Sequence, residues 1–165
     1  MRILGLDPGL RATGYALLEA GPGGRGARLV EGGTLRVPAR ADLARRLAQL
    51  ARDAGALVEE LRPDTVAVEA VHSRPPFPQS AILLAHARGV LLACAAAAGV
   101  RVVEYTAADI KKSVTGRGAA GKEQVARMVE RILGLAGPLE PDHVSDAAAC
   151  ALCHLANERV EAWRG

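Results

Sequence analysis

The stretch Arg2-Ile3-Leu4-Gly5-Leu6-Asp7-Pro8-Gly9 is the part of the sequence from which the fold is predicted. Its large apolar residues fall on both faces of a strand, which is typical of a strand in the middle of a covered sheet. The Pro-Gly pair predicts an immediate turn. The strand therefore carries the carboxylate of Asp7 to its C-terminal tip, where a charge is costly unless a cation meets it. A turn-capping role for Asp7 is the alternative interpretation.

Length and composition restrict the class of protein. The chain has 165 residues, which suits a single domain over residues 1–165 with a sizeable core. Its 50% apolar and 24% charged residues exclude a disordered chain. The net charge of +3 permits a polyanionic partner without requiring one. The lysines all lie in one short stretch, at Lys111, Lys112 and Lys122.

Several negative features indicate a cytoplasmic protein. The N-terminus lacks the pattern of a signal peptide, and no uninterrupted apolar run reaches the roughly 18 residues that a membrane span needs. Three cysteines in such a chain indicate reduced thiols. Residues 150–154 spell the haem-attachment pattern C-x-x-C-H, but their alanine-rich surroundings predict ordinary helix packing instead.

Apolar spacing and turn residues predict an α/β fold. We expect a mixed five-stranded sheet flanked by helices, in which the first three strands form an antiparallel meander. The predicted strands cover residues 2–7, 13–19, 28–37, 65–70 and 101–105. The predicted helices cover residues 43–61, 81–98, 107–114, 122–133 and 142–160. Asp42 and Ser80 are the expected N-caps of the first two helices.

The predicted helix at 81–98 is apolar around more than one face. Such a helix is either enclosed by the core of its own subunit or partly covered by a partner subunit. Both interpretations remain open at the level of sequence.

Acidic residues end two of the predicted strands. Glu69 ends the fourth strand as Asp7 ends the first. If these strands are parallel neighbours, both carboxylates emerge at one edge of the sheet, where open α/β sheets bind ligands. Because two adjacent acids repel each other, the arrangement calls for a cation.

The predicted last helix begins with further candidate ligands. Asp142, His143 and Asp146 lie on one side of its first turns. The small residues after Asp146 would let this helix lie close to the sheet. Carboxylates suit Mg²⁺ or Mn²⁺, and Mn²⁺ also accepts imidazole. For Asp142, a helix cap or a partner of the helix dipole is the simpler interpretation.

A glycine-rich segment precedes the helix predicted at 122–133. Its G-x-x-x-x-G-K pattern ends at Lys122 and resembles a P-loop, but Glu123 stands where Mg²⁺ binding needs Ser or Thr. With Lys111 and Arg117 nearby, the segment predicts contact with a nucleic-acid backbone. A solvated basic face is the competing interpretation.

Several short motifs follow one another along nearly the whole chain. They are Asp7-Pro8-Gly9, Thr13-Gly14-Tyr15, Glu69, Ala87-Arg88-Gly89, the region of Lys111 and Lys122, and His143-x-x-Asp146-Ala147. As a set, they resemble the RuvC family of Holliday-junction resolvases. Each motif alone is weak, but their order and coverage are specific.

The resemblance implies an RNase H-like fold and a Mg²⁺-dependent crossover junction endodeoxyribonuclease that acts in recombination and DNA repair. Such an enzyme is a homodimer that nicks two strands symmetrically across a four-way junction, alongside a branch-migration motor of the RuvA and RuvB type. Two Mg²⁺ ions per site are implied, with Mn²⁺ as a substitute. They would activate the attacking water and stabilise the leaving 3′ oxygen.

The resemblance also implies roles for residues. The implied catalytic and metal-binding set is Asp7, Glu69, His143 and Asp146, and the implied DNA contacts include Lys111 and Lys122. Many relatives have a carboxylate at the position of His143, so this imidazole is either a ligand or a general base, and Asp142 could share its task.

A second departure concerns the residue that stacks within the opened junction. Relatives often have a phenylalanine at the position of His72, and we expect Phe77 or Arg74 to replace it. Two other functions remain open on the sequence: an RNA-processing nuclease of the related YqgF type, and a non-catalytic junction-binding module.

Overall fold

The computed structural model describes residues 1–22, 26–70 and 79–164. Its strands are β1 (Arg2–Asp7), β2 (Ala12–Ala20), β3 (Ala27–Arg36), β4 (Thr65–Glu69) and β5 (Arg101–Tyr105). Its helices are α1 (Leu43–Leu61), α2 (Gln79–Ala97), α3 (Ala107–Thr115), α4 (Lys122–Leu133) and α5 (Asp142–Arg164). These elements match the predicted ones to within a few residues.

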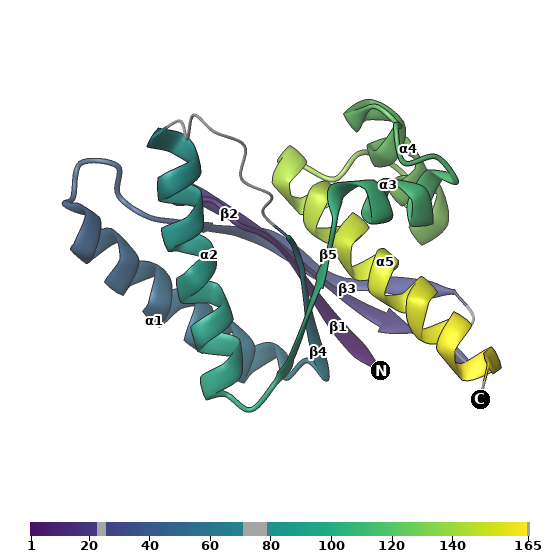
Figure 1. Cartoon of the computed structure of the whole chain (residues 1–165), viewed down its shortest axis with the longest axis horizontal. Coiled ribbons are helices and arrows are strands. Elements are labelled where there is room, and N and C mark those ends of the chain that lie inside the picture. The colour runs from purple at the N-terminus through teal and green to yellow at the C-terminus, as the bar shows by residue number, and fades with distance from the viewer. Residues whose placement is uncertain (23–25, 71–78, 165) are drawn as a thin grey trace.

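The strands form one sheet in the order β3-β2-β1-β4-β5. β1 pairs antiparallel with β2 and parallel with β4, and β5 extends the parallel half. The predicted mixed sheet with an opening antiparallel meander is therefore confirmed. Helices α1 and α2 cover one face of this sheet, and α3, α4 and α5 cover the other (Figure 1).

The central strand β1 is buried on both faces, as its sequence predicts. Ile3 packs into the cluster formed with α5, whereas Leu4 and Leu6 pack into the cluster formed with α1 and α2. Because side chains alternate along a strand, Asp7 follows Ile3 onto the face covered by α5. In β4 the same alternation puts Glu69 on the face of Ala67, which also packs with α5.

Helix α5 lies directly on the sheet. A Cβ atom on Gly5 would stand 1.9 Å from the carbonyl oxygen of Ala147, and one on Gly14 would stand 2.1 Å from that of His143. Neither helix nor strand leaves room for a side chain at these two points. The small residues of α5 thus have their counterpart in two glycines of the sheet.

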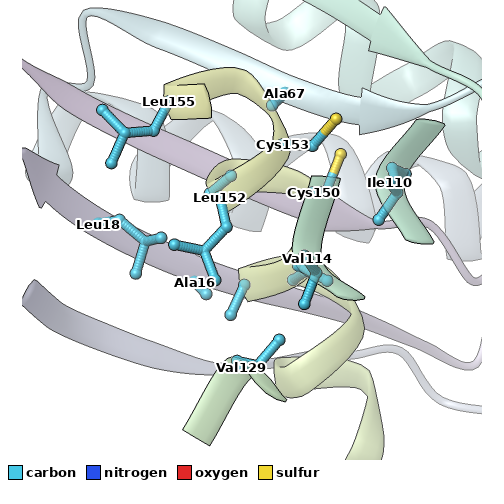
Figure 2. Packing of buried hydrophobic residues seen from close by; sticks show 14 of the residues in the cluster. Ala16, Leu18, Ala67, Ile110, Val114, Val129, Cys150, Leu152, Cys153 and Leu155 are labelled. Carbon is cyan, nitrogen blue, oxygen red and sulfur yellow. The ribbon is translucent and has the colours of Figure 1, made fainter. Parts of the chain in front are cut away.

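The cysteines of α5 belong to the core. Figure 2 shows Cys150 and Cys153 among the apolar side chains of this cluster, and both thiols are almost completely buried. Burial raises the pKa of Cys150 well above its usual value. This environment confirms helix packing as the reason for the C-x-x-C-H pattern.

Two details of the helix ends decide the predicted caps. Asp42 caps α1, since its Oδ1 accepts a hydrogen bond of 2.9 Å from the backbone N–H of Arg45. The predicted cap at Ser80 is wrong. Helix α2 begins at Gln79, directly after Pro78 in the sequence, so Ser80 lies inside the first turn instead of before it.

Helix α2 is only partly enclosed by the fold. Its buried residues are Ala87, Leu91 and Ala95, and Ile82 is 50% exposed. The alternative in which the core encloses this helix is therefore wrong. In the described part of the chain, α2 is the helix that is long and apolar enough to cross a membrane by length and composition. This is weak evidence, because apolar helices of soluble proteins pass the same test.

The contact between Gly5 and α5 yields a stability prediction. We expect Gly5→Ala to lower the free energy of unfolding by about 3 kcal/mol, because the new methyl group would meet backbone that cannot rotate away. Urea denaturation measures the difference.

Gly55→Ala is the matched control for this substitution. Gly55 lies within α1, and nothing stands within 4 Å of the position of its Cβ. The same change should there raise the free energy of unfolding by about 0.5–1 kcal/mol through helix propensity. Equal effects at both glycines would contradict the close contact of α5 with β1.

Candidate active site

Three side chains from distant parts of the sequence meet at the tip of β1. Ligand atoms of Asp7, His143 and Asp146 all lie within 4.8 Å of one another. Nδ1 of His143 lies 2.6 Å from Oδ2 of Asp7. Two carboxylates and an imidazole at this spacing form a donor set suited to a divalent cation.

Local structure accounts for this meeting. Helix α5 begins at Asp142, so His143 and Asp146 are three residues apart and point to the same side of its first turns. Gly14 pairs with Asp7 across β1 and β2 and permits the close approach of His143. The turn after Asp7 is tied by Thr13, whose buried hydroxyl donates to the carbonyl oxygen of Gly9 over 2.9 Å. Thr13 thus stabilises the turn, and Asp7 contacts α5 instead.

Glu69 lies in the same cavity as Asp7 and Asp146, but it is not part of the cluster formed by Asp7, His143 and Asp146. A cavity of about 280 Å³ includes Asp7, Glu69, Lys111, Lys122 and Asp146 in its lining. We call this cavity the carboxylate cleft. The parallel pairing of Leu6 with Val68 brings the ends of β1 and β4 together at this edge, as the sequence predicts.

Arg88 of α2 supports the wall of the cleft at Glu69. Its Nε donates to the carbonyl oxygen of Glu69 over 3.2 Å, and its Nη2 forms an ion pair of 2.6 Å with Glu104 of β5. The Ala-Arg-Gly motif seen in the sequence therefore has a structural role at the end of β4.

Lys122 takes a place that sequence reasoning did not assign to it. Its Nζ lies 3.0 Å from Oδ2 of Asp146 and 3.5 Å from Oδ2 of Asp142. Hydrogen bonding to Asp146 raises the pKa of Lys122. The only sequence signal for this contact is the position of Lys122 as first residue of a helix that follows a glycine-rich linker.

The electrostatics of the cleft favour a bound cation. The pKa of Asp7 is raised, first by burial and further by the neighbouring Asp146, although the hydrogen bond with His143 acts in the opposite direction. A carboxylate whose charged form is disfavoured gains the most from a cation beside it. Asp7, Glu69 and Asp146 offer oxygen ligands from the lining, and His143 beside Asp7 offers a nitrogen ligand.

Other predicted residues do not join the cluster. Asp142 is 82% exposed and belongs to none of the metal-ligand groups found among the described residues. It lies in the first turn of α5 and not before it, so the predicted cap is wrong and the position is that of a helix-dipole partner. Arg117 is exposed on the linker between α3 and α4 and does not line the carboxylate cleft. His72, Arg74 and Phe77 lie outside the described residues.

Comparison with known families identifies this arrangement. The family model of crossover junction endodeoxyribonuclease RuvC matches residues 3–154. The chain belongs to the RuvC family. Its predicted function as a Holliday-junction resolvase is confirmed. The alternatives of an RNA-processing nuclease and of a non-catalytic module give way to this assignment.

Relatives of the chain match it over nearly its full length. RuvC of Syntrophomonas wolfei is 42% identical over 163 residues, which cover 99% of this chain and 93% of the relative. RuvC of Bordetella avium is 46% identical over 154 residues, which cover 93% of this chain and 83% of the relative.

Solved structures confirm the RNase H-like fold. Thermus thermophilus RuvC is 31% identical, with a TM-score of 0.87 over 98% of this chain and 97% of that structure. T. thermophilus RuvC in complex with a Holliday junction substrate is 29% identical, with a TM-score of 0.86 over 97% of this chain and 96% of that structure. The yeast mitochondrial Holliday junction resolvase shares the fold at 13% identity and a TM-score of 0.72, over 99% and 83% of the two chains.

The raised pKa of Asp7 predicts how its neutralisation affects stability. A carboxyl with a raised pKa in the folded state stabilises the protein while protonated, and this contribution is lost as pH rises through that pKa. Without metal at pH 7.5, Asp7→Asn should therefore raise the melting temperature by about 2 °C. The difference should shrink as the pH falls through the raised pKa of Asp7, because the wild-type side chain then becomes protonated.

Differential scanning fluorimetry measures both effects and supplies its own control. Mg²⁺ should raise the melting temperature of the wild type more than that of Asp7→Asn, since only the wild type retains the charge. A lower melting temperature of metal-free Asp7→Asn would mean that the contact between Asp7 and His143 outweighs the cost of burial.

Proposed function

We propose that the protein cleaves four-way DNA junctions by Mg²⁺-dependent hydrolysis of phosphodiester bonds, with Asp7, Glu69, His143 and Asp146 as metal-binding and catalytic residues. The observation that carries this proposal is the convergence of Asp7, His143 and Asp146 within 4.8 Å. Membership of the RuvC family supplies the reaction class, and a solved structure of T. thermophilus RuvC is in complex with a Holliday junction substrate.

The residues of the carboxylate cleft fit two divalent cations. Asp7 is central, because Asp146 joins its cluster and Glu69 ends the neighbouring strand, so Asp7 would help to hold both ions, with Asp146 and Glu69 as further ligands. Bound Mg²⁺ or Mn²⁺ supplies activation of the attacking water and stabilisation of the leaving 3′ oxygen.

His143 has two possible tasks in this scheme. In the neutral tautomer with the proton on Nδ1, its 2.6 Å contact with Asp7 orients the ring and leaves the lone pair of Nε2 available. That nitrogen can bind a metal ion or accept a proton from water. Asp142 takes no part in the proposed mechanism, because its side chain is almost fully exposed.

The basic residues near the cleft are proposed to bind the DNA backbone. Lys111 and Lys122 line the carboxylate cleft, and Lys122 neutralises Asp146 there. In the cleft, the lysines would attract a bound phosphate, and the carboxylates would attract bound metal ions. Arg117 extends the basic surface along the linker before α4. His72, Arg74 and Phe77 complete the proposed set of DNA contacts, with Phe77 or Arg74 stacking within the opened junction.

Partners and location follow from the family. We propose a homodimer whose interface includes the exposed apolar side of α2, because a two-fold dimer suits a substrate with two equivalent strands. A branch-migration motor of the RuvA and RuvB type is the proposed further partner, in the cytoplasm. Residues 1–165 are proposed to act as one nuclease domain.

Junction cleavage tests the proposal directly. With Mg²⁺, the wild type should convert a synthetic four-way junction into paired nicks that ligase can reseal, and should leave unbranched duplex intact. Asp7→Asn should lower the cleavage rate by at least about 10³-fold, because it removes charge at the centre of the metal site. Its junction binding should persist, because the basic surface is unchanged.

Asp53→Asn is the matched control for this assay. Asp53 lies on α1 and accepts a hydrogen bond from Gln49, which asparagine can also accept. Asp53→Asn should therefore cleave the junction at the same rate as the wild type. No nicking by the wild type with either Mg²⁺ or Mn²⁺ would falsify the proposed function. Loss of junction binding in Asp7→Asn would instead assign Asp7 a structural role.

Substitutions of His143 test its contribution. His143→Ala should slow cleavage about 10²-fold, the usual worth of a positioned acid–base group. His143→Asp should restore most of the rate, because a carboxylate can serve both proposed tasks. Wild-type rates for His143→Ala would exclude both tasks.

A further inference from the structure

A second cavity adjoins the catalytic residues at His143. Its volume is about 420 Å³, and it lies between the β1–β2 turn and the beginnings of α1 and α2. The polar side chains in its lining are Arg11, Arg46, Ser80 and His143, and none of its described lining residues is a carboxylate. We call this hollow the arginine cavity. Since His143 also contacts Asp7, the arginine cavity is next to the carboxylate cleft.

Arg46 is held in place without a negative partner. Its Nη2 donates to the carbonyl oxygen of Leu10 over 3.2 Å, and its Nε is buried without a hydrogen-bond partner. Across residues 1–22, 26–70 and 79–164, no carboxylate lies within ion-pair distance of Arg46. A partly buried guanidinium without an anion is costly, so its retention points to an anionic ligand.

The preceding residue shows the contrast. The side chain of Arg45 is 84% exposed, and its Nε lies 3.3 Å from Oδ2 of Asp42. These two arginines are neighbours on α1, yet the exposed one has the carboxylate and the partly buried one lacks it. Solvent cannot explain this difference, because the group with less access to water is the one without the ion pair.

Arg11 adds a second cation to the cavity. It lies on the turn four residues after Asp7, its side chain is exposed, and no described carboxylate pairs with it. Two guanidinium groups with a nearby hydroxyl favour an anion with several oxygens. Arginine binds phosphate oxygens through parallel N–H donors, which makes phosphate the fitting chemical class.

We propose that the arginine cavity binds a backbone phosphate of the cleaved DNA strand, adjacent to the phosphate that is hydrolysed in the carboxylate cleft. This inference rests on the proposed function, because it takes the junction as ligand. The strand then crosses His143, with Lys111 and Lys122 on one side and Arg46 and Arg11 on the other. Holding the adjacent phosphate fixes which bond lies over the metal-binding residues.

The test uses Arg46→Met, which keeps the length of the side chain and removes its charge. Binding of the full-length protein to a four-way junction is measured without divalent metal over a series of salt concentrations. Arg46→Met should bind about tenfold more weakly than the wild type. The slope of log affinity against log salt should fall by about one for each protomer. Arg45→Met is the matched control and should leave affinity and slope unchanged.

Substrate changes identify the phosphate. Single neutral methylphosphonates are placed at successive positions around the cleavage point and on the uncleaved strands. One position next to the scissile phosphate should weaken binding of the wild type and have no further effect on Arg46→Met. If the position that weakens binding of the wild type but not of Arg46→Met lies on another arm, the assignment to the cleaved strand is overturned. Identical profiles for both proteins would overturn the site altogether.

Further variants separate charge from folding. Arg46→Lys should restore the salt slope while recovering only part of the affinity, because lysine lacks the paired donors. Arg11→Met removes an exposed side chain that has no described hydrogen bond to the fold, and it should also lower the slope. An unchanged slope in Arg11→Met and Arg46→Met, both with native melting temperatures, would overturn the inference even if the wild type binds and cleaves junctions. Failure of the wild type to bind would instead refute the proposed function.

Discussion

Backbone contact between α5 and the two strands β1 and β2 is the constraint on which the active site depends. Gly5 and Gly14 leave no space for a Cβ beneath the carbonyl oxygens of Ala147 and His143. Only at this separation does a side chain from the first turn of α5 reach the carboxylate at the tip of β1. The packing of the core and the spacing of the candidate ligands therefore depend on the same glycines. Larger residues at these positions would push α5 away from the sheet and move His143 and Asp146 away from Asp7.

The opposite wall of the carboxylate cleft is held by a different set of contacts. The backbone N–H of Ala70 donates to the carbonyl oxygen of Tyr105 over 2.8 Å, which ties the residue after Glu69 to the end of β5. The hydroxyl of Tyr105 lies 2.8 Å from Nδ1 of the buried His154 on α5. Burial raises the pKa of Tyr105 to about 12, so its hydroxyl stays protonated at neutral pH. Helix α5 thus supports both sides of the cleft.

The distribution of charge follows the same organisation. The acids gather where β1, β4 and α5 meet, and lysine is the cation among them. Arginines without carboxylate partners lie on the other side of His143. A DNA strand placed here would meet positive charge on both sides of the carboxylate cleft. Within the cleft, bound cations would be needed between the carboxylates and the phosphate of the strand.

Prediction from sequence succeeded where the determining interactions are local. The continuous apolar run of β1 and the leucine spacing of α1 depend on the geometry of one element, and both elements lie where their patterns place them. The acids at the strand ends followed from that geometry and the parallel pairing of β1 with β4. Ser80 was assigned wrongly because a cap depends on where the preceding loop delivers the chain, which periodicity does not encode.

The sequence by itself determined the elements, the antiparallel meander that opens the mixed sheet, the family, and which acids end the strands. Tertiary structure alone decided that Lys122 enters the carboxylate cleft, that Asp142 stays in solvent, and that Arg46 lies in a cavity without an acid. The physical reason is the distance along the sequence over which the determining interactions act. Alternation, caps and turns act over a few residues, whereas these three placements depend on how helices far apart in the chain pack against one sheet.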